Sequence, residues 1–279
     1  MVEAAAVLKH GSRGVAAALV LGFFGVIKPL QFYSRVLVYL LLIAGCGIYG
    51  ALASIVLTLA GKQGLSQWTT ARVFYTLARY ILGIKVVISN PEALKTRPAV
   101  FVSNHQSELD ILILGATFPQ YCSVTAKKAL KYYPFLGWFM TLSGSVFIDR
   151  KNRSDALKAF DSAVKKVNRD KQSVFMFPEG TRSYYQEPGL LPLKKGAFHF
   201  AVQGQVPVVP FVASNYSKFF SFQKRIFEKG TIEIKVLDPI ETKGMTAADV
   251  NSLYEKVQTS MKETVDELGY GSLYNDKLK

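Results

Sequence analysis

Residues 99–110 read AVFVSNHQSELD, an apolar run followed at once by a polar one. The apolar run predicts a buried strand, and Ser107 with Asp110 three positions later predicts a helix that has the serine as its N-cap. A strand that passes directly into a helix is the repeating unit of α/β folds. The turn between them would bring the His105 imidazole and the Asp110 carboxylate to one edge of the sheet.

This histidine and this carboxylate fit two interpretations. In the ordinary one, His105 is a polar surface residue and Asp110 caps a helix. In the chemical one, His105 is a general base and Asp110 orients it. Histidine is scarce, since the chain contains only His10, His105 and His199. The rest of the chain has to decide between the two.

From residue 84 onward, short apolar runs alternate with segments of helical periodicity. Strands are expected at 84–88, 99–102, 122–125, 145–148, 173–177, 206–212 and 231–236. Helices are expected at 107–117, 154–168 and 251–268. We therefore predict an α/β domain over 84–279, with a mostly parallel central sheet flanked by helices. Ligands bind such sheets at the carboxyl ends of the strands.

An uncharged run precedes this domain, at 36–60. As a helix of about 25 residues it is long enough to cross the hydrocarbon core of a bilayer, and a helix buried in a protein core is the alternative. Glycines 45, 47 and 50 would make a smooth patch on it for helix packing. We predict a membrane span.

Two further segments complete the N-terminal part. Residues 66–82 form a basic helix with aromatic side chains, which fits the membrane interface and equally fits packing against the next domain. The apolar run 15–27 is too short to span comfortably, and we expect it to dip into the membrane after a flexible start at 1–14. The predicted units are an extension over 1–30, membrane-anchoring helices over 31–83, and the α/β domain.

The amino-acid composition limits the classes of molecule that this protein can bind. The chain carries 34 basic and 20 acidic residues, a formal charge of +14, and is 49% hydrophobic. Nucleic acid and anionic lipid both satisfy this charge, but the apolar span favours lipid. Nucleic acid is the poorest match, because the basic residues are interleaved with apolar sequence. Two cysteines provide no disulfide framework, and no Cys/His cluster has metal-ligand spacing.

Charged residues follow three of the expected strands. They are His105, the pair Asp149-Arg150, and the loop Pro178-Glu179-Gly180-Thr181-Arg182-Ser183. Lys127, Lys194 and Lys195 add cations. Because the carboxyl ends of parallel strands share one edge, these groups predict a site for a phosphorylated substrate with a general base beside it.

Four motifs make the pattern specific. His105-x4-Asp110, Phe-Ile-Asp-Arg at 147–150, Phe-Pro-Glu-Gly-Thr-Arg-Ser at 177–183 and Val-Pro-Val-Val-Pro at 206–210 stand in the order found in glycerolipid acyltransferases. From about Gln31 to the C-terminus the chain resembles the 1-acyl-sn-glycerol-3-phosphate (lysophosphatidate) acyltransferases, most of all the fungal endoplasmic-reticulum type. Residues 1–30 lie outside the resemblance.

The resemblance implies acyl transfer from acyl-CoA to the sn-2 hydroxyl of lysophosphatidate, giving phosphatidate, at the membrane of the endoplasmic reticulum or of a lipid droplet. It implies His105 as the general base and Asp110 as the group that orients it. The substrate-binding residues it implies are Lys127, Arg150, Glu179, Gly180, Thr181 and Arg182. Lys127 and Arg182 are the best candidates for the phosphate. Acyl-CoA is a co-substrate, and neither a further cofactor nor a metal is expected.

The residue chemistry agrees with direct transfer. The chain has no Gly-x-Ser-x-Gly motif and no cysteine near the expected site, so the acceptor hydroxyl must itself attack the thioester, with help from a base. Two alternatives stay open. One is an acyltransferase for another acceptor, such as glycerol-3-phosphate, another lysophospholipid or lysocardiolipin. The other is a non-catalytic lipid-binding protein.

Overall fold

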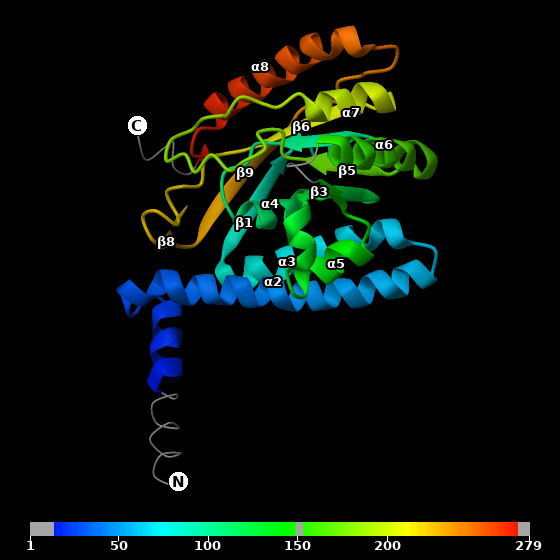
Figure 1. Ribbon diagram of the computed structural model, residues 1–279. Coiled ribbons are helices and arrows are strands. Elements are labelled where there is room, and N and C mark those ends of the chain that lie inside the picture. The colour runs from blue at the N-terminus through cyan, green and yellow to red at the C-terminus, as the bar shows by residue number, and fades with distance from the viewer. Residues whose placement is uncertain (1–13, 149–152, 273–279) are drawn as a thin grey trace.

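The computed structural model describes residues 14–148 and 153–272, as a central sheet with helices on both faces (Figure 1). The strand order is β1-β9-β6-β2-β5-β3-β4. The strands are β1 (Ile84–Ser89), β2 (Val100–Ser103), β3 (Cys122–Lys127), β4 (Val146–Ile148), β5 (Ser173–Met176), β6 (Val208–Ala213) and β9 (Gly230–Val236). Neighbours pair in parallel except β6 and β9, which are antiparallel. The predicted mostly parallel sheet is confirmed.

The central strands are buried on both faces, which explains why they read as continuous apolar runs. In β2, Val100 and Val102 belong to the core beneath α6 (Arg153–Asp170), α7 (Gly196–Gly204) and α8 (Val250–Leu268). Phe101, between them, belongs to the core on the opposite face. That second core is closed by helices α2, α3 and α4; in Figure 1, α2 runs along the bottom of the fold and α4 stands at the height of β1 and β3.

Helix α2 (Lys28–Leu59) contains the predicted span but begins eight residues earlier. Pro29 lies in the first turn of this helix, where proline is favoured because its missing N–H is not needed. A shorter apolar helix, Gly14–Phe23, begins one residue before the predicted 15–27 run and ends within it. The expected flexible start falls almost wholly outside the described residues.

Helix α3 (Ser66–Leu82) follows the 3-10 turn η1 (Gln63–Leu65) and has the predicted bounds. It ends at Gly83 in the left-handed conformation, with a φ of 69°. Its Arg72 guanidinium donates to the carbonyls of Ala116 and, at 3.2 Å, Phe118, which closes the last turn of α4 (Asp110–Thr117). Arg72 thus serves packing, one of the two roles open to this basic helix.

The predicted start of α4 at Ser107 is wrong. The helix begins at Asp110, and the N-cap position is held by Leu109, without a side-chain hydrogen bond. The Ser107 hydroxyl instead accepts from the Leu109 N–H at 3.2 Å, within the preceding turn. Half of the capping box is present, because the Asp110 carboxylate accepts from the Ser107 N–H at 3.1 Å.

The glycine patch on α2 packs as expected at two of its three positions. A Cβ on Gly47 would lie 3.2 Å from the Phe135 backbone, and one on Gly50 would lie 2.5 Å from the ring of Phe139. Both neighbours belong to α5 (Leu136–Leu142) or the residue before it. Gly45 faces open space.

Several short elements were not predicted. They are α7, the hairpin of β7 (Phe220–Ser221) and β8 (Ile226–Phe227), and the 3-10 turns η2 (Pro91–Lys95), η3 (Lys128–Tyr132) and η4 (Ala247–Asp249). The hairpin packs against α2 through Phe222, whose ring lies 5.4 Å from that of Phe32. It closes one end of the lower core.

Candidate active site

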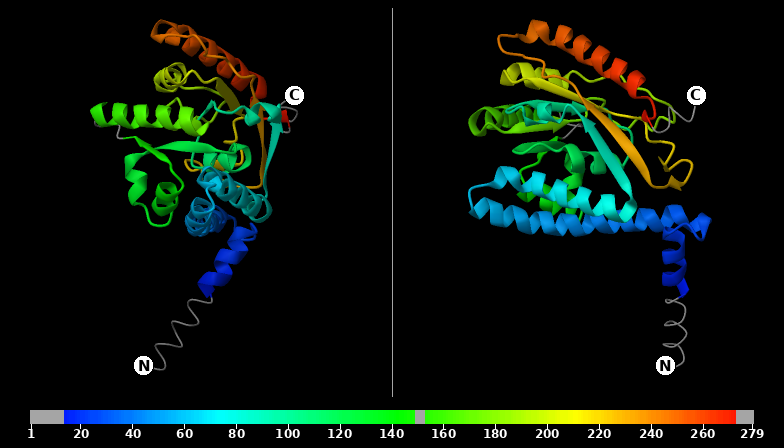
Figure 2. Two further views of the ribbon diagram at one scale, coloured as in Figure 1. Left: turned by 90° about the vertical axis from the view of Figure 1, so that its right-hand side faces the viewer. Right: turned by 180° about the vertical axis from the view of Figure 1, so that it is seen from behind.

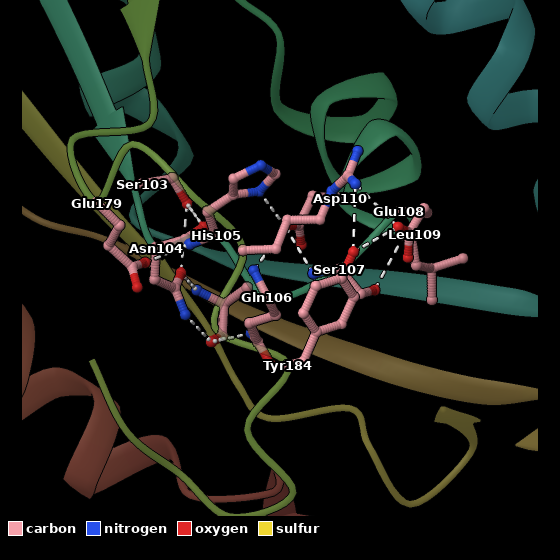
Figure 3. Close-up of polar contacts among 12 residues, drawn as sticks. Ser103, Asn104, His105, Gln106, Ser107, Glu108, Leu109, Asp110, Glu179 and Tyr184 are labelled. Atoms are coloured by element: carbon pink, nitrogen blue, oxygen red, sulfur yellow. Dashed lines mark hydrogen bonds and ion pairs between the residues drawn. The ribbon is translucent and has the colours of Figure 1, made fainter. Parts of the chain in front are cut away.

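The loop between β2 and α4 brings the two predicted catalytic residues together. His105 Nδ1 lies 2.7 Å from Asp110 Oδ2 (Figure 3). The imidazole keeps 18% of its surface exposed, whereas the carboxylate keeps 3%. The histidine therefore faces the outside of the protein while its partner is enclosed, as a general base and its orienting group require.

The Asp110 carboxylate accepts hydrogen bonds on both oxygens. Oδ2 accepts from the backbone N–H of Gln106 at 2.7 Å and of Ser107 at 3.1 Å, besides His105. Oδ1 accepts from the Tyr216 hydroxyl at 2.7 Å. A carboxylate fixed by four donors holds the imidazole in one orientation.

These contacts define a directed chain of hydrogen bonds. Tyr216 has one hydroxyl proton and donates it to Asp110, so the 2.8 Å contact between the Tyr216 and Ser107 hydroxyls must be donated by the serine. The serine oxygen in turn accepts from the Leu109 N–H. Burial, followed by the Asp110 charge, raises the pKa of Tyr216 well above its usual value, so its hydroxyl keeps the proton.

The imidazole is also fixed by stacking. Its ring lies 3.9 Å from the Phe177 ring, with 13° between the planes. Because the carboxylate accepts at Nδ1, that nitrogen carries the hydrogen, and Nε2 presents its lone pair. The arrangement can remove a proton from a hydroxyl placed at Nε2.

Glu179, predicted to bind substrate, uses both carboxylate oxygens within the protein. Oε1 accepts from the His105 backbone N–H and Oε2 from the Leu191 N–H at 3.1 Å. Its side chain is enclosed, and burial raises its pKa to about 7. Glu179 thereby anchors the backbone that carries His105.

The rest of this motif forms the turn beside the histidine. Gly180 has a φ of 71°, a left-handed conformation that favours glycine. Thr181 is exposed. Arg182 does not pair with Glu179 across the turn but with Glu108, at 2.9 Å.

A tyrosine and two amides complete the edge. The Tyr184 hydroxyl donates to the same Glu108 oxygen as Arg182, at 2.6 Å. Asn104 extends the β2–β6 pairing with its side chain, which donates to the Ala213 carbonyl and accepts from the Ala213 N–H, both at 2.9 Å. The Gln106 amide donates to the Ala213 and Ser214 carbonyls. The loop is thus tied to the end of β6.

Of the two remaining predicted residues, the structure describes one, Lys127, which lies farther along the sheet. Lys127 ends β3, two strands from β2, and is exposed; its side chain makes no hydrogen bond to the side chain of a described residue. Arg150 lies outside the described residues; Ile148, just before the gap, pairs with Lys127 in the parallel ladder. The structure brings Lys127 to the predicted edge but not into contact with His105.

Other chemistries find little support in the part of the chain that the structure describes. Within residues 14–148 and 153–272, no three His, Cys, Asp or Glu side chains are grouped to hold a metal ion. Cys122 lies at the amino end of β3, away from the site edge, and burial raises the pKa of its thiol. A thiolate nucleophile is therefore not offered there.

Tyr216, Ser107 and Phe177 were not identified as site residues from the sequence. Tyr216 lies three residues beyond the end of β6, which runs parallel to β2. The rule that selected His105 and Glu179, polar groups just after a parallel strand, applies to Tyr216 as well. Applied to every predicted strand, it would have included the tyrosine.

An imidazole hydrogen-bonded to a buried carboxylate lies at the carboxyl edge of a mostly parallel sheet, and similarity to known proteins places a chain with this fold in the acyltransferase class. The family model described as Acyltransferase matches residues 85–214. The 1-acyl-sn-glycerol-3-phosphate acyltransferase of Saccharomyces cerevisiae is 46% identical over 251 residues, which are 90% of this chain and 83% of that protein. The human protein named 1-acyl-sn-glycerol-3-phosphate acyltransferase beta is 37% identical over 85% of this chain and 84% of its own.

A solved structure agrees. The crystal structure of the 1-acyl-sn-glycerophosphate acyltransferase from Thermotoga maritima superposes with a TM-score of 0.68 at 26% identity, covering 88% of this chain and 96% of that one. The chain belongs to the 1-acyl-sn-glycerol-3-phosphate acyltransferase family.

Proposed function

We propose that this enzyme transfers a fatty acyl group from acyl-CoA to the sn-2 hydroxyl of lysophosphatidate, producing phosphatidate and CoA. The observation that carries the proposal is the 2.7 Å contact between His105 Nδ1 and Asp110, which leaves Nε2 as the base. The names of the relatives support lysophosphatidate as the acceptor.

The residues support a one-step transfer. His105 Nε2 takes the proton of the acceptor hydroxyl while its oxygen attacks the thioester carbonyl carbon. The new C–O bond forms, the C–S bond breaks, and the departing CoA sulfur takes the proton from the imidazolium. Asp110 stabilises the charged imidazole between these two events.

The acceptor's phosphate is assigned to the cations at the same edge. Arg182 keeps 40% of its side chain exposed, and its contacts with Glu108 and Tyr184 use one guanidinium nitrogen, so we assign its other N–H groups to the phosphate. Lys127 and Arg150 complete the predicted set, with Gly180 and Thr181 shaping the turn beside them. Glu179 contributes indirectly, through the His105 backbone.

Helix α2 supports a membrane location. Among the described helices, α2 is the one long and apolar enough to cross a bilayer. Its exposed face is apolar: Leu37, Leu41, Ile48, Leu52, Ile55 and Leu59. Its buried face is mixed, with Ser34, Arg35 and Ser54 beside the core residues Phe32, Tyr39 and Cys46. A water-facing helix has a polar exposed face instead, so we propose that the exposed face of α2 meets lipid, in the endoplasmic reticulum or on a lipid droplet.

The test is acyl transfer by purified His105→Ala protein. Loss of the base should lower the rate by about 100- to 10,000-fold. His199→Ala is the matched control, because this histidine is exposed on α7. CoA release is followed with lysophosphatidate, glycerol-3-phosphate and other lysophospholipids as acceptors. Full activity of His105→Ala would refute the mechanism, and a preference for another acceptor would refute the substrate.

A further inference from the structure

A second surface of the catalytic domain carries exposed aromatic side chains. It is formed by residues 128–142, which comprise η3 and α5 and are called here the aromatic segment. Tyr132 and Trp138 are 74% and 58% exposed. Tyr133, Phe135 and Leu142 are exposed as well. Large apolar side chains gathered on one surface mark a contact with a partner or a membrane.

The aromatic segment packs directly against α2, on the side of that helix that carries the buried Gly47 and Gly50. Helix α5 is seated on α2, where Gly47 and Gly50 allow the backbone and ring of the segment to approach closely. Both views of Figure 2 place α5 beside α2, on the side of the molecule away from α8. The aromatic segment and α2 therefore lie on the same side of the molecule.

The charged residues in and beside the aromatic segment indicate which kind of partner it contacts. Lys127 and Lys131 are exposed at the start of the segment, and no Asp or Glu occurs anywhere from residue 111 to residue 148. Lysines beside tyrosine and tryptophan are the composition of a membrane interface, where rings sit at headgroup depth and cations meet anionic lipid. A second copy of this chain is a poor partner, because its net charge of +14 would repel the same lysines.

We propose that the aromatic segment is a bilayer-contact element of the catalytic domain, separate from α2, and that it docks on anionic phospholipid. The inference rests on the proposed use of a membrane-borne acceptor. Docking of the segment would also have a consequence for function. The segment directly follows β3, whose carboxyl end lies at the edge of the sheet that carries His105. When the aromatic segment docks on the bilayer, the sheet edge that carries His105 is held toward the membrane surface that supplies the acceptor.

The chain provides its own reporter, since Trp68 and Trp138 are its two tryptophans. Full-length Trp68→Phe protein is reconstituted in vesicles of zwitterionic lipid with or without phosphatidylglycerol, and Trp138 quenching by phospholipids brominated near the headgroup is measured. A matched protein carries Trp68→Phe and Trp138→Phe together with Tyr254→Trp on α8, on the far side of the sheet (Figure 1).

We expect Trp138 to be quenched strongly, the tryptophan on α8 weakly, and the Trp138 quenching to increase with phosphatidylglycerol. Lys131→Glu should shift the ratio of quenched to unquenched Trp138 by about 5- to 30-fold, whereas Lys256→Glu, with the same charge change on α8, should not. Equal quenching of the two tryptophans would overturn the inference, as would Trp138 emission that follows protein concentration rather than lipid. Transfer activity of the same samples is measured in parallel, so an active enzyme with unquenched Trp138 refutes this inference alone.

Discussion

Replacing Tyr216 by phenylalanine removes one oxygen from the chain of hydrogen bonds behind His105. Asp110 Oδ1 loses the hydroxyl that lies 2.7 Å away, and the Ser107 hydroxyl loses its acceptor. A hydrogen bond to a charged group contributes about 1.5 to 3 kcal/mol. If all of it is felt in the transition state, kcat falls by about 10- to 150-fold. KM for the acceptor should change less than kcat, because the Tyr216 hydroxyl is buried and is hydrogen-bonded to Asp110 and Ser107.

Tyr39→Phe is the matched control. Tyr39 is also a buried tyrosine, and its hydroxyl donates to the Glu108 backbone carbonyl of the same loop at 2.8 Å, without touching the carboxylate. Loss of this neutral bond, about 0.5 to 1.5 kcal/mol, should leave kcat within a few-fold of the original. Both variants are compared by kcat and KM at matched protein stability. Equal kcat for folded Tyr216→Phe and Tyr39→Phe would refute a positioning role for Tyr216.

Three further substitutions test the framework of the site. Glu179→Gln should change the pH dependence of stability: because the folded-state pKa of about 7 exceeds the usual 4.5, the folded protein holds a proton that the unfolded chain releases. We therefore expect the difference in unfolding free energy, original protein minus variant, to fall by up to about 3 kcal/mol as the pH rises from 4.5 to 7. Denaturant titration at each pH measures it, and a difference that does not change with pH would contradict this expectation. Gly180→Ala should cost about 1 to 2 kcal/mol at its φ of 71°, seen as a lower Tm, and an unchanged Tm would show that the turn relaxes. Asn104→Ala should cost about 1 to 3 kcal/mol, because the buried Ala213 N–H loses its acceptor, and amide hydrogen exchange at Ala213 should accelerate.

The features that were predictable are those written in local sequence. His105 and Asp110 stand five residues apart, so one strand-to-helix turn is enough to bring them together. The strands of the sheet could be located because central parallel strands are buried on both faces and read as apolar runs. By contrast, α7 begins at a glycine, is short and has no side-chain N-cap, so no local signal marked it.

The partners of the site residues could not be predicted, because they depend on which distant segments the fold brings together. Tyr216 is 106 positions from the carboxylate it binds. Glu179 and Arg182 stand in one charged loop, and sequence alone cannot show that one turns inward to a backbone N–H while the other reaches Glu108. Which partner each of these side chains meets is determined by tertiary packing rather than by local sequence propensity.

The core below the sheet has a consequence for how the enzyme can be handled. Phe32, Tyr39 and Cys46 of α2 lie in the same buried cluster as Phe211 and Ile232 of the sheet. The anchor and the catalytic fold are therefore one cooperative unit, and unfolding of either exposes the other. A truncation that starts at β1 to obtain a water-soluble enzyme would remove part of the core rather than a detachable leader. A preparation that keeps the fold intact therefore has to include the whole of α2.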